Sequence, residues 1–326
     1  MAFPAVAAAS DGERDAVTWK MGTVISSQVP WAKHIRDIIE PAVDQASGGK
    51  LRLHWYWGGV LGDENRYIEL MRKGELQGMG SSSMGLVAAC PEVSVLELPF
   101  LFLNWDEVDF VRERMAGPLD EHAQKRGFKL LMLVDQDFDQ IYSSRVKLDS
   151  VAAFRRARFG SWNGPLEESL LDVLGAPAMS VDVQSALPAF KRQEADAFIA
   201  PALWVVWAQL HPVVRYVSPV RVRYSPGGAV VTTTAWQSLD EDFRADYLSR
   251  RDALEREFCS RSRRDSQDAL RAMLRYGVQL TEMPPAEMER FRAQCRKTWE
   301  KNAGVLYPQS LLDEVLALLK EYRQKP

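Results

Sequence analysis

The sequence predicts an α/β protein with mostly parallel sheets, and three observations lead to this prediction. Between residue 17 and about residue 204, segments with strand-like alternation take turns with segments of helical periodicity. The 326 residues, 46% hydrophobic and 26% charged, are enough for two soluble domains with separate cores. The last third of the chain has helical patterns throughout, and the sequence contains no internal repeat.

The N-terminal part of the chain carries the clearest strand and helix signals. Residues 17–25 predict a strand. Residues 30–49 predict an amphipathic helix that ends at Gly48 and Gly49. Residues 50–57 alternate large apolar side chains with others, which is typical of a strand. Further along, we expect helices at 62–76 and 164–175, and strands at 77–83, 128–138 and 195–204.

A long helical pattern begins after Ser238, which forms a predicted capping box with Glu241. Apolar residues mark both ends of this pattern, whereas residues 259–267 are polar all round. Such a pattern indicates either one rod that bridges two lobes or two helices with a break near residues 260–266. Residues 284–304 and 308–323 predict two final helices, each opened by proline.

Composition excludes several classes of partner and chemistry. A net charge of −3 gives no reason to expect nucleic acid, and no apolar run approaches the roughly 20 residues that span a bilayer. The sequence lacks nucleotide-binding and hydrolase motifs, so we predict neither an enzyme nor a cofactor. Asp135 to Gln140 begin like a calcium loop, but Val146 stands where the loop needs glutamate, and we predict no metal site.

The N-terminus and the cysteines each leave two interpretations open. Residues 1–16 are small and apolar at first, as in the remnant of an export signal or in a disordered terminus. Cys259 and Cys295 lie on separate predicted helices, where they form either a disulfide or two free thiols.

Short motifs occur in a recognisable order along the chain. Gly48-Gly49-Lys50 closes the first predicted helix, Leu61-Gly62 opens the next, and LPFLF occupies residues 98–102. Residues 174–198 and 235–243 continue the pattern with LGA and a tryptophan before a leucine. In this order and spacing, residues 17–260 resemble the solute-binding proteins of TRAP transporters, the DctP-type extracytoplasmic receptors.

The resemblance implies a two-lobed periplasmic-binding-protein fold, similar to type II, with a long helix spanning both lobes. The first lobe is expected to comprise residues 17–138 and about 212–250, and the second lobe residues 139–211 and about 251–326. The implied location is periplasmic or otherwise extracytoplasmic. If the protein is anchored to a membrane, the anchor is expected to be a removed N-terminal segment. The implied partners are a small-molecule ligand and TRAP membrane permease subunits.

Two arginines that hold the ligand carboxylate in this family have no counterpart here. Alignment with the family pattern puts Gly160 where one arginine belongs and Asp139 where the other belongs. The basic run at 155–158 is then interpreted as a solvated edge of the second lobe. The resemblance therefore implies a cleft without a carboxylate-binding site.

Correspondence with the family suggests aromatic and small polar residues as the lining of the cleft. The predicted ligand-binding residues are Gln28, Trp31, Trp57, Ser82, Met84, Phe138, Asp139, Gly160, Trp162, Asn163, Phe198 and Trp204. Apolar walls with a few polar groups suit a neutral or hydrophobic ligand. One alternative is a cationic amine held by Asp139. Another is a protein-interaction module without solute binding, which docks an accessory protein on the leucine-rich C-terminal helices.

Overall fold

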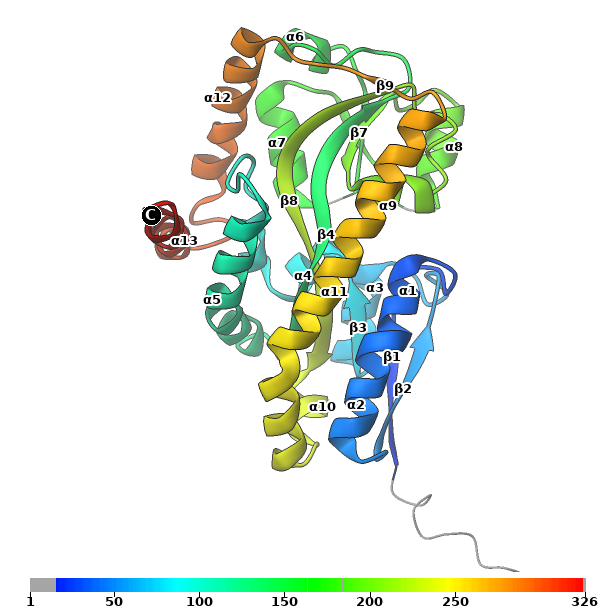
Figure 1. The fold of residues 1–326 in the computed structure, drawn as a ribbon, viewed down its shortest axis with the longest axis vertical. Helices are drawn as coiled ribbons and strands as arrows, with labels where there is room; N and C mark the ends of the chain where they lie inside the picture. The colour runs from blue at the N-terminus through cyan, green and yellow to red at the C-terminus, as the bar shows by residue number, and fades with distance from the viewer. Residues whose placement is uncertain (1–15, 163, 183, 325–326) are drawn as a thin grey trace, which may run out of the picture.

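The computed structural model describes residues 16–162, 164–182 and 184–324, and it has the two-lobed α/β architecture that the resemblance implies (Figure 1). Within these residues, one nine-stranded sheet has the order β2-β1-β3-β8-β4-β7-β5-β6, and β9 pairs with β8. The strands are β1 (Val17–Gly22), β2 (Leu51–Tyr56), β3 (Gly78–Ser81), β4 (Phe128–Ser143), β5 (Phe159–Ser161), β6 (Ala178–Ser180), β7 (Ala197–Ala200), β8 (Tyr216–Thr232) and β9 (Gln279–Leu280).

The helices lie on both faces of this sheet. They are α1 (Pro30–His34), η2 (Ile35–Ile39), α2 (Glu40–Ser47), α3 (Glu64–Arg72), α4 (Ser83–Ala89), η3 (Pro91–Glu97), α5 (Trp105–Gln124), α6 (Val151–Phe154), α7 (Pro165–Leu174), α8 (Ala186–Lys191), α9 (Ala202–Trp207), α10 (Thr233–Gln237), α11 (Glu241–Arg275), α12 (Pro285–Asn302) and α13 (Gln309–Arg323).

Two long antiparallel strands, β4 and β8, connect the lobes (Figure 1). Their pairing runs from Phe128–Thr232 in the first lobe, around β1 to β3, to Ser143–Tyr216 in the second lobe, around β5 to β7. The prediction of mostly parallel pairing is therefore only partly right, because the strands that cross between lobes pair in opposite directions. β4 also continues five residues past the predicted end at Phe138, since Ile141 and Tyr142 pack into the core of the second lobe.

The predicted helix at 30–49 forms one continuous helical stretch with a π-turn in its middle. Ile35–Ile39 form this turn immediately before Glu40 and Pro41. Proline has no backbone N–H to donate to the preceding turn and clashes with it, so the wider π-turn accommodates Pro41 without ending the helix. Ile35, Ile38 and Ile39 thereby face the sheet of the first lobe together with α11.

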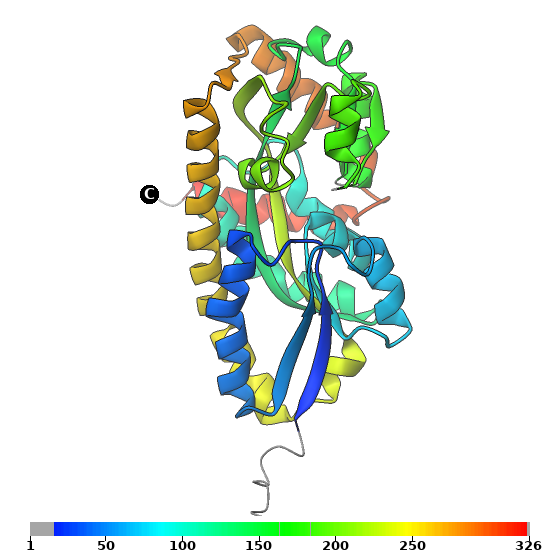
Figure 2. The same cartoon turned by 90° about the vertical axis from the view of Figure 1, so that its right-hand side faces the viewer.

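The long helix α11 is unbroken over 35 residues, so the single-rod interpretation is confirmed and the two-helix alternative is wrong. Figure 2 shows it running along one side of both lobes, beside α1 and α2. The predicted capping box is absent, because Asp240 occupies the N-cap position and the Ser238 hydroxyl donates to the carbonyl of Ala235 at 2.8 Å. The helix instead begins at Glu241, after the short helix α10 has ended at Gln237.

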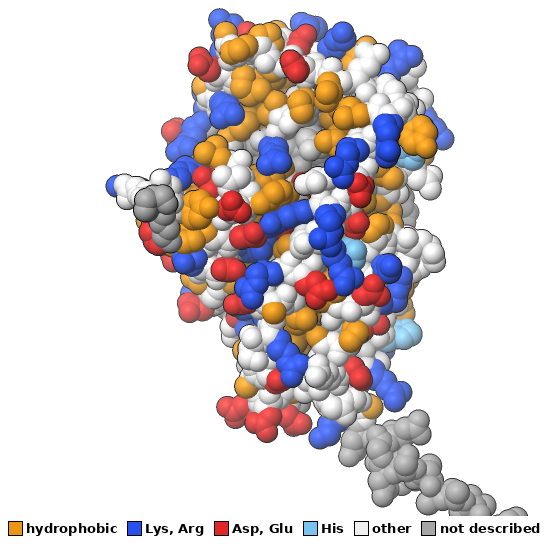
Figure 3. Space-filling model, viewed as in Figure 1, with side chains coloured by type: hydrophobic (Ala, Val, Ile, Leu, Met, Phe, Trp, Pro, Cys, Tyr) orange, Lys and Arg blue, Asp and Glu red, His pale blue; other side chains and the backbone are white. Residues whose placement is uncertain are grey.

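The polar centre of α11 contacts the crossing strands rather than only solvent. Arg263 donates through Nε to Asp135 Oδ2 at 2.7 Å, and the Ser262 hydroxyl donates to the Asp135 carbonyl at 2.8 Å. The Ser266 hydroxyl donates to the Asp137 carboxylate. On the outer face, basic and acidic side chains are interspersed along α11 and α5 (Figure 3). The central polarity of the helix is therefore explained by buried partners on β4.

The second lobe packs α7, α8, α9 and α12 around β5, β6 and β7. The segment predicted as one strand at 195–204 divides at Pro201 into β7 and α9, which places Trp204 on a helix. Pro201 is the N-cap of α9 and has no N–H to continue the ladder. The division of the chain into lobes at residues 138/139, 211/212 and 250/251 stays a prediction.

Cys259 and Cys295 are buried free thiols in different core clusters, so the disulfide interpretation is wrong. Within the described residues, no helix has the length and apolarity needed to cross a bilayer. Residues 1–15, which include most of the predicted processed or disordered N-terminus, lie outside the described residues.

Candidate functional site

A cavity of about 940 Å³ opens between the two lobes and extends into the first lobe. Its walls come from β1 to β4, β8, the π-turn and α11 on the first-lobe side. From the second lobe they include β5, the start of α7, and α9. Polar side chains gather where the lobes face each other, and apolar side chains line the deeper part. The cavity thus has a polar mouth and an apolar chamber.

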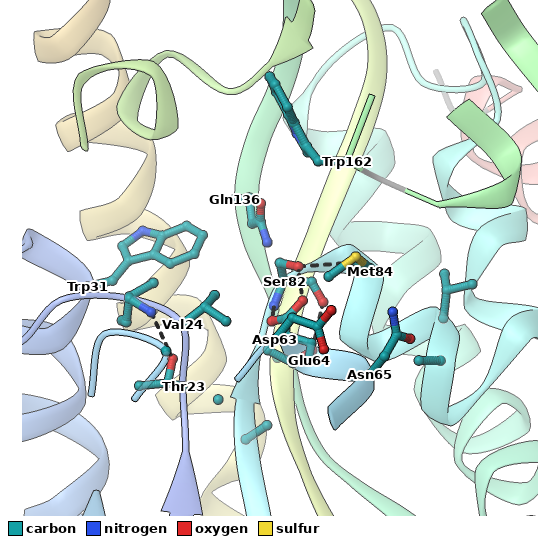
Figure 4. Close-up of a pocket in the computed structure, with 18 of the residues that line it drawn as sticks. Thr23, Val24, Trp31, Asp63, Glu64, Asn65, Ser82, Met84, Gln136 and Trp162 are labelled. Atoms are coloured by element: carbon teal, nitrogen blue, oxygen red, sulfur yellow. Dashed lines mark hydrogen bonds between the residues drawn. The ribbon is translucent and has the colours of Figure 1, made fainter. Parts of the chain in front are cut away.

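At the mouth, the carboxylate of Glu64 lies at the N-terminal end of α4, where a bound anion could otherwise lie (Figure 4). Its carboxylate accepts hydrogen bonds from the backbone N–H groups of Ser82 at 2.6 Å and Gly85 at 3.0 Å, and from the Ser82 hydroxyl. Burial raises the pKa of Glu64, while these donors act to lower it. Because an internal carboxylate takes the donors at this helix end, they are not free for an anionic ligand.

Gln136 enters the mouth from β4, between Trp162 and Ser82 (Figure 4). Gln136 has no paired residue on β8, since Asp135 pairs with Pro226 and Asp137 pairs with the adjacent Ser225. A bulge of this kind redirects a side chain and often lies beside a binding site. Gln136 is only 3% exposed, and among the described residues its side-chain nitrogen has no hydrogen-bond partner.

Aromatic side chains from both lobes form the walls of the mouth. The rings of Trp162 and Trp204 stack in the second lobe with centroids 4.0 Å apart. From the first lobe, Trp31 donates its indole N–H to the Ser262 hydroxyl of α11 at 2.9 Å, and its ring packs near Phe258. These contacts fix the rings before any ligand arrives, which lowers the entropy lost on binding.

The chamber lies between the first-lobe sheet and the layer formed by η2, α2 and α11. Ile39 and Val43 line it from the helix side, and Leu53 and Ala229 from the sheet. Leu53 of the edge strand β2 and Ala229 of the interior strand β8 are only partly buried, because they face this space. Apolar atoms dominate the chamber, so it suits apolar groups of a ligand.

Fixed charge in the cavity has one sign. The aspartates and glutamates that line it are Asp63, Glu64, Glu168 and Asp182, and the described lining contains no lysine, arginine or histidine. Nor do the described residues contain a group of three or more side chains suited to hold a metal ion. A carboxylate ligand would therefore meet like charge without a cationic partner.

The structure brings part of the predicted site together. Trp31, Ser82, Met84, Trp162 and Trp204 all line the cavity. Asn163 lies outside the described residues.

The other predicted residues lie away from the cavity lining. Gln28 is exposed on the loop after β1. Trp57 stacks on Trp55, and it is Trp55 that lines the cavity. Phe138 and Phe198 are fully buried core residues of the first and second lobe. A strand presents alternate residues to opposite faces, so a displacement by one residue exchanges a cavity position for a core or surface position.

Asp139 and Gly160, the two positions aligned with the family arginines, also lie outside the lining. Asp139 is fully buried and pairs with Arg223 at 2.8 Å. A Cβ atom at Gly160 would stand 3.2 Å from Val181 Cγ2 and would face Phe190 and Ala195 of the second-lobe core. The neighbouring Ser161 lines the cavity instead.

Sequence reasoning missed Gln136, Glu64 and most of the chamber. Gln136 stands in the polar run DQDFDQ, whose alternation with aspartates was a visible signal of an unusual strand. Glu64 follows Leu61-Gly62 and Asp63, where it is indistinguishable from an ordinary first-turn glutamate. The chamber residues have the periodicity of core residues, and no local pattern separates a filled core from a hollow one.

Comparison with known proteins identifies a family of solute-binding proteins. A family model for bacterial extracellular solute-binding proteins, family 7 (DctP), matches residues 21–304. The 2,3-diketo-L-gulonate-binding periplasmic protein YiaO of Escherichia coli is 22% identical over 220 residues, which are 67% of this chain and 66% of that protein. An uncharacterised protein of Haemophilus influenzae is 22% identical over 215 residues, or 65% and 64% of the two chains. The match thus spans just under two thirds of these curated relatives.

Solved structures extend the similarity over almost the whole fold. The sugar acid binding protein DctPAm from Advenella mimigardefordensis, in complex with galactonate, superposes with a TM-score of 0.85 at 19% identity, covering 94% of this chain and 99% of that chain. A TRAP periplasmic solute binding protein from Ralstonia eutropha, with bound (S)-2-acetolactate, gives a TM-score of 0.83 at 20% identity, covering 93% and 99%. The chain belongs to family 7 of the bacterial extracellular solute-binding proteins, the DctP family.

Proposed function

We propose that this protein is an extracytoplasmic receptor of a TRAP-type importer and that it captures an uncharged, largely apolar small molecule between its lobes. The observation that carries the ligand class is the cavity lining, which includes four acidic residues, many apolar residues and no described cation. The solved relatives that were crystallised with acids are about 20% identical to this chain. Similarity at this level shows a shared fold and does not show a shared ligand.

The two crossing strands, β4 and β8, would allow the lobes to close around a ligand. β4 and β8 carry both lobes, and their ladder is interrupted by register shifts at three points. Such irregular points in long strands absorb small changes of backbone angle when lobes close around a ligand. Closure would bring Trp162 and Trp204 over the ligand and exclude water. The closed receptor would then deliver the ligand to membrane permease subunits.

A cationic ligand is the second candidate, and the acidic residues of the mouth favour it. In the sequence-based form of this hypothesis Asp139 held the amine, but Asp139 is paired with Arg223 and does not reach the cavity. Asp63, Glu168 and Asp182 would have to take this role. The protein-interaction hypothesis has less support, because Leu311, Leu312, Val315 and Leu319 of α13 are buried in the first-lobe core cluster with α5 rather than exposed for docking.

A three-membered probe set tests the ligand class. Cyclohexanecarboxamide, cyclohexylmethylamine and cyclohexanecarboxylate share a ring and differ in charge. We expect the amide to raise the melting temperature and to bind in calorimetry, with little dependence on ionic strength. Tightest binding by the amine, weakened by salt, would select the cationic alternative. Tightest binding by the carboxylate would overturn both.

A further inference from the structure

One strand connects the polar mouth with the apolar chamber. Along β4, Met132, Val134 and Gln136 all line the cavity. The four-residue separation between Met132 and Gln136 corresponds to roughly 13 Å of extended strand. A ligand that follows this wall therefore contacts apolar side chains over most of its length and an amide at one end.

At the mouth end of this wall, the side-chain amide of Gln136 has a hydrogen-bond donor without an acceptor in the described part of the chain. Gln136 is almost fully buried, and its side-chain nitrogen has no partner among the described residues. A buried N–H donor without a partner loses about 1–3 kcal/mol of solvation. The neighbouring Gly227 keeps the space beside it open, since a Cβ atom there would stand 3.2 Å from Gln136 Cγ. An oxygen acceptor from a ligand would remove this cost.

The chamber end is predominantly apolar, although Trp55 of β2 also lines the cavity and its buried indole N–H has no partner among the described residues. Trp19, Leu53, Val43 and Ala229 surround it, and these residues come from β1, β2, α2 and β8. A cavity with such walls binds alkyl or alicyclic groups and excludes charged ones.

We propose that the ligand is an elongated, uncharged amphiphile, whose ketone, ester or amide oxygen accepts a hydrogen bond from Gln136 and whose apolar body occupies the chamber of the first lobe. This inference rests on the proposed function and adds the position and shape of the ligand. The chamber makes the body, rather than the head group, the main source of affinity. It also makes affinity depend on chain length.

A homologous series of 2-alkanones, from 2-hexanone to 2-undecanone, tests the chamber. We expect each added methylene to tighten the dissociation constant by about three- to fourfold until the chamber is filled. Nonanoate, which has the same nine carbons as 2-nonanone but ends in a carboxylate, is expected to bind at least about 100-fold more weakly, because it brings an unpaired charge to an acidic mouth.

Gln136→Leu tests the head-group contact. We expect it to weaken 2-nonanone binding by about fivefold, the usual net value of one hydrogen bond. The ligand-free protein should be as stable as before or more stable, because an unpartnered buried amide is lost. Gln140→Leu is the matched control, since Gln140 is a buried glutamine of β4 that lies outside the cavity and accepts from Tyr142. It should lower stability and leave 2-nonanone affinity unchanged.

Ala229→Phe tests the chamber by filling it. We expect this variant to abolish the gain in affinity from 2-hexanone to 2-nonanone. Val43→Phe fills the chamber from the opposite wall. It replaces Ala229→Phe in this test if Ala229→Phe does not fold. Val60→Phe adds the same ring at a position that is 70% exposed, and it should leave the series unchanged.

The outcomes separate this inference from the proposed function. Ketones whose affinity does not change with chain length, or unchanged 2-nonanone affinity in Gln136→Leu, would overturn the inference. If cyclohexanecarboxamide binds and no alkanone does, the inference fails and the proposed function stands. If nonanoate binds as tightly as 2-nonanone, both fail.

Discussion

Arg223 on β8 donates through Nε to the carboxylate of Asp139 on β4 at 2.8 Å, and both side chains are fully shielded from solvent. The same guanidinium contacts Glu97 of η3 at 3.3 Å and Glu167 of α7 at 2.8 Å. One cation thus joins the crossing strands to a helix of each lobe. This pairing also explains why Asp139, though aligned with a family arginine, is not available to a ligand.

Arg223→Met should destabilise the protein by about 3–5 kcal/mol, because it leaves three buried carboxyl groups without the cation that contacts all of them. Chemical denaturation measures this change. Arg192→Met provides the comparison, since Arg192 pairs with Glu194 on the surface and should contribute little. A loss at Arg223 as small as that at Arg192 would show that the cluster is neutral or open to water.

The same cluster predicts that stability falls as pH rises. Burial raises the pKa of Glu97 to about 8 and of Asp139 to about 7, although Arg223 acts in the opposite direction. Carboxyl groups with a raised pKa keep protons that the unfolded chain releases near pH 4. Their contribution to stability is therefore complete below about pH 4 and is lost as the pH rises through 7 and 8.

Glu97→Gln tests this pH dependence, because glutamine keeps the shape and cannot ionise. We expect its free energy of unfolding to decline less steeply between pH 6 and 8 than that of the wild type. Denaturation at closely spaced pH values gives both slopes. Parallel slopes would mean that Glu97 does not titrate in this range.

Neighbouring residues of β5 should respond differently to an added arginine. Gly160→Arg should destabilise the fold by about 3 kcal/mol or more, because the new side chain starts 3.2 Å from Val181 and faces the second-lobe core. Ser161→Arg instead adds a cation to the cavity and should produce binding of cyclohexanecarboxylate, measured by calorimetry.

Ser161→Met adds volume without charge and should not bind the carboxylate. A stable Gly160→Arg protein that binds carboxylates would show that position 160 reaches the cleft, as the family alignment implied.

The C-terminal helix should behave as part of the core. Leu319→Ala is expected to destabilise the protein by about 2–5 kcal/mol, since Leu319 is buried beside α5. Lys320→Ala, at the adjacent exposed position, should have little effect. Thermal denaturation of both variants gives the comparison, and equal stability would favour a docking role for α13.

The sequence by itself determined the fold family and most of the elements. Periodicity identified the helices at 30–49 and 308–323, and glycine pairs and prolines marked many of their ends. The long helix after residue 240 was predicted as one of two alternatives, because a polar centre is compatible with either solvent or buried polar partners. These features depend on neighbours in the chain, so local patterns are sufficient to show them.

Only the tertiary structure decided which residues line the cavity. Trp55 rather than Trp57, Ser161 rather than Gly160, and Gln136 rather than Asp139 reach it. Each choice depends on strand register and on one bulge, where a displacement of one residue reverses the face. The chamber depends on how far the π-turn and α11 stand from the sheet. That separation is set by packing between distant segments, so it cannot be predicted from the sequence of any one segment.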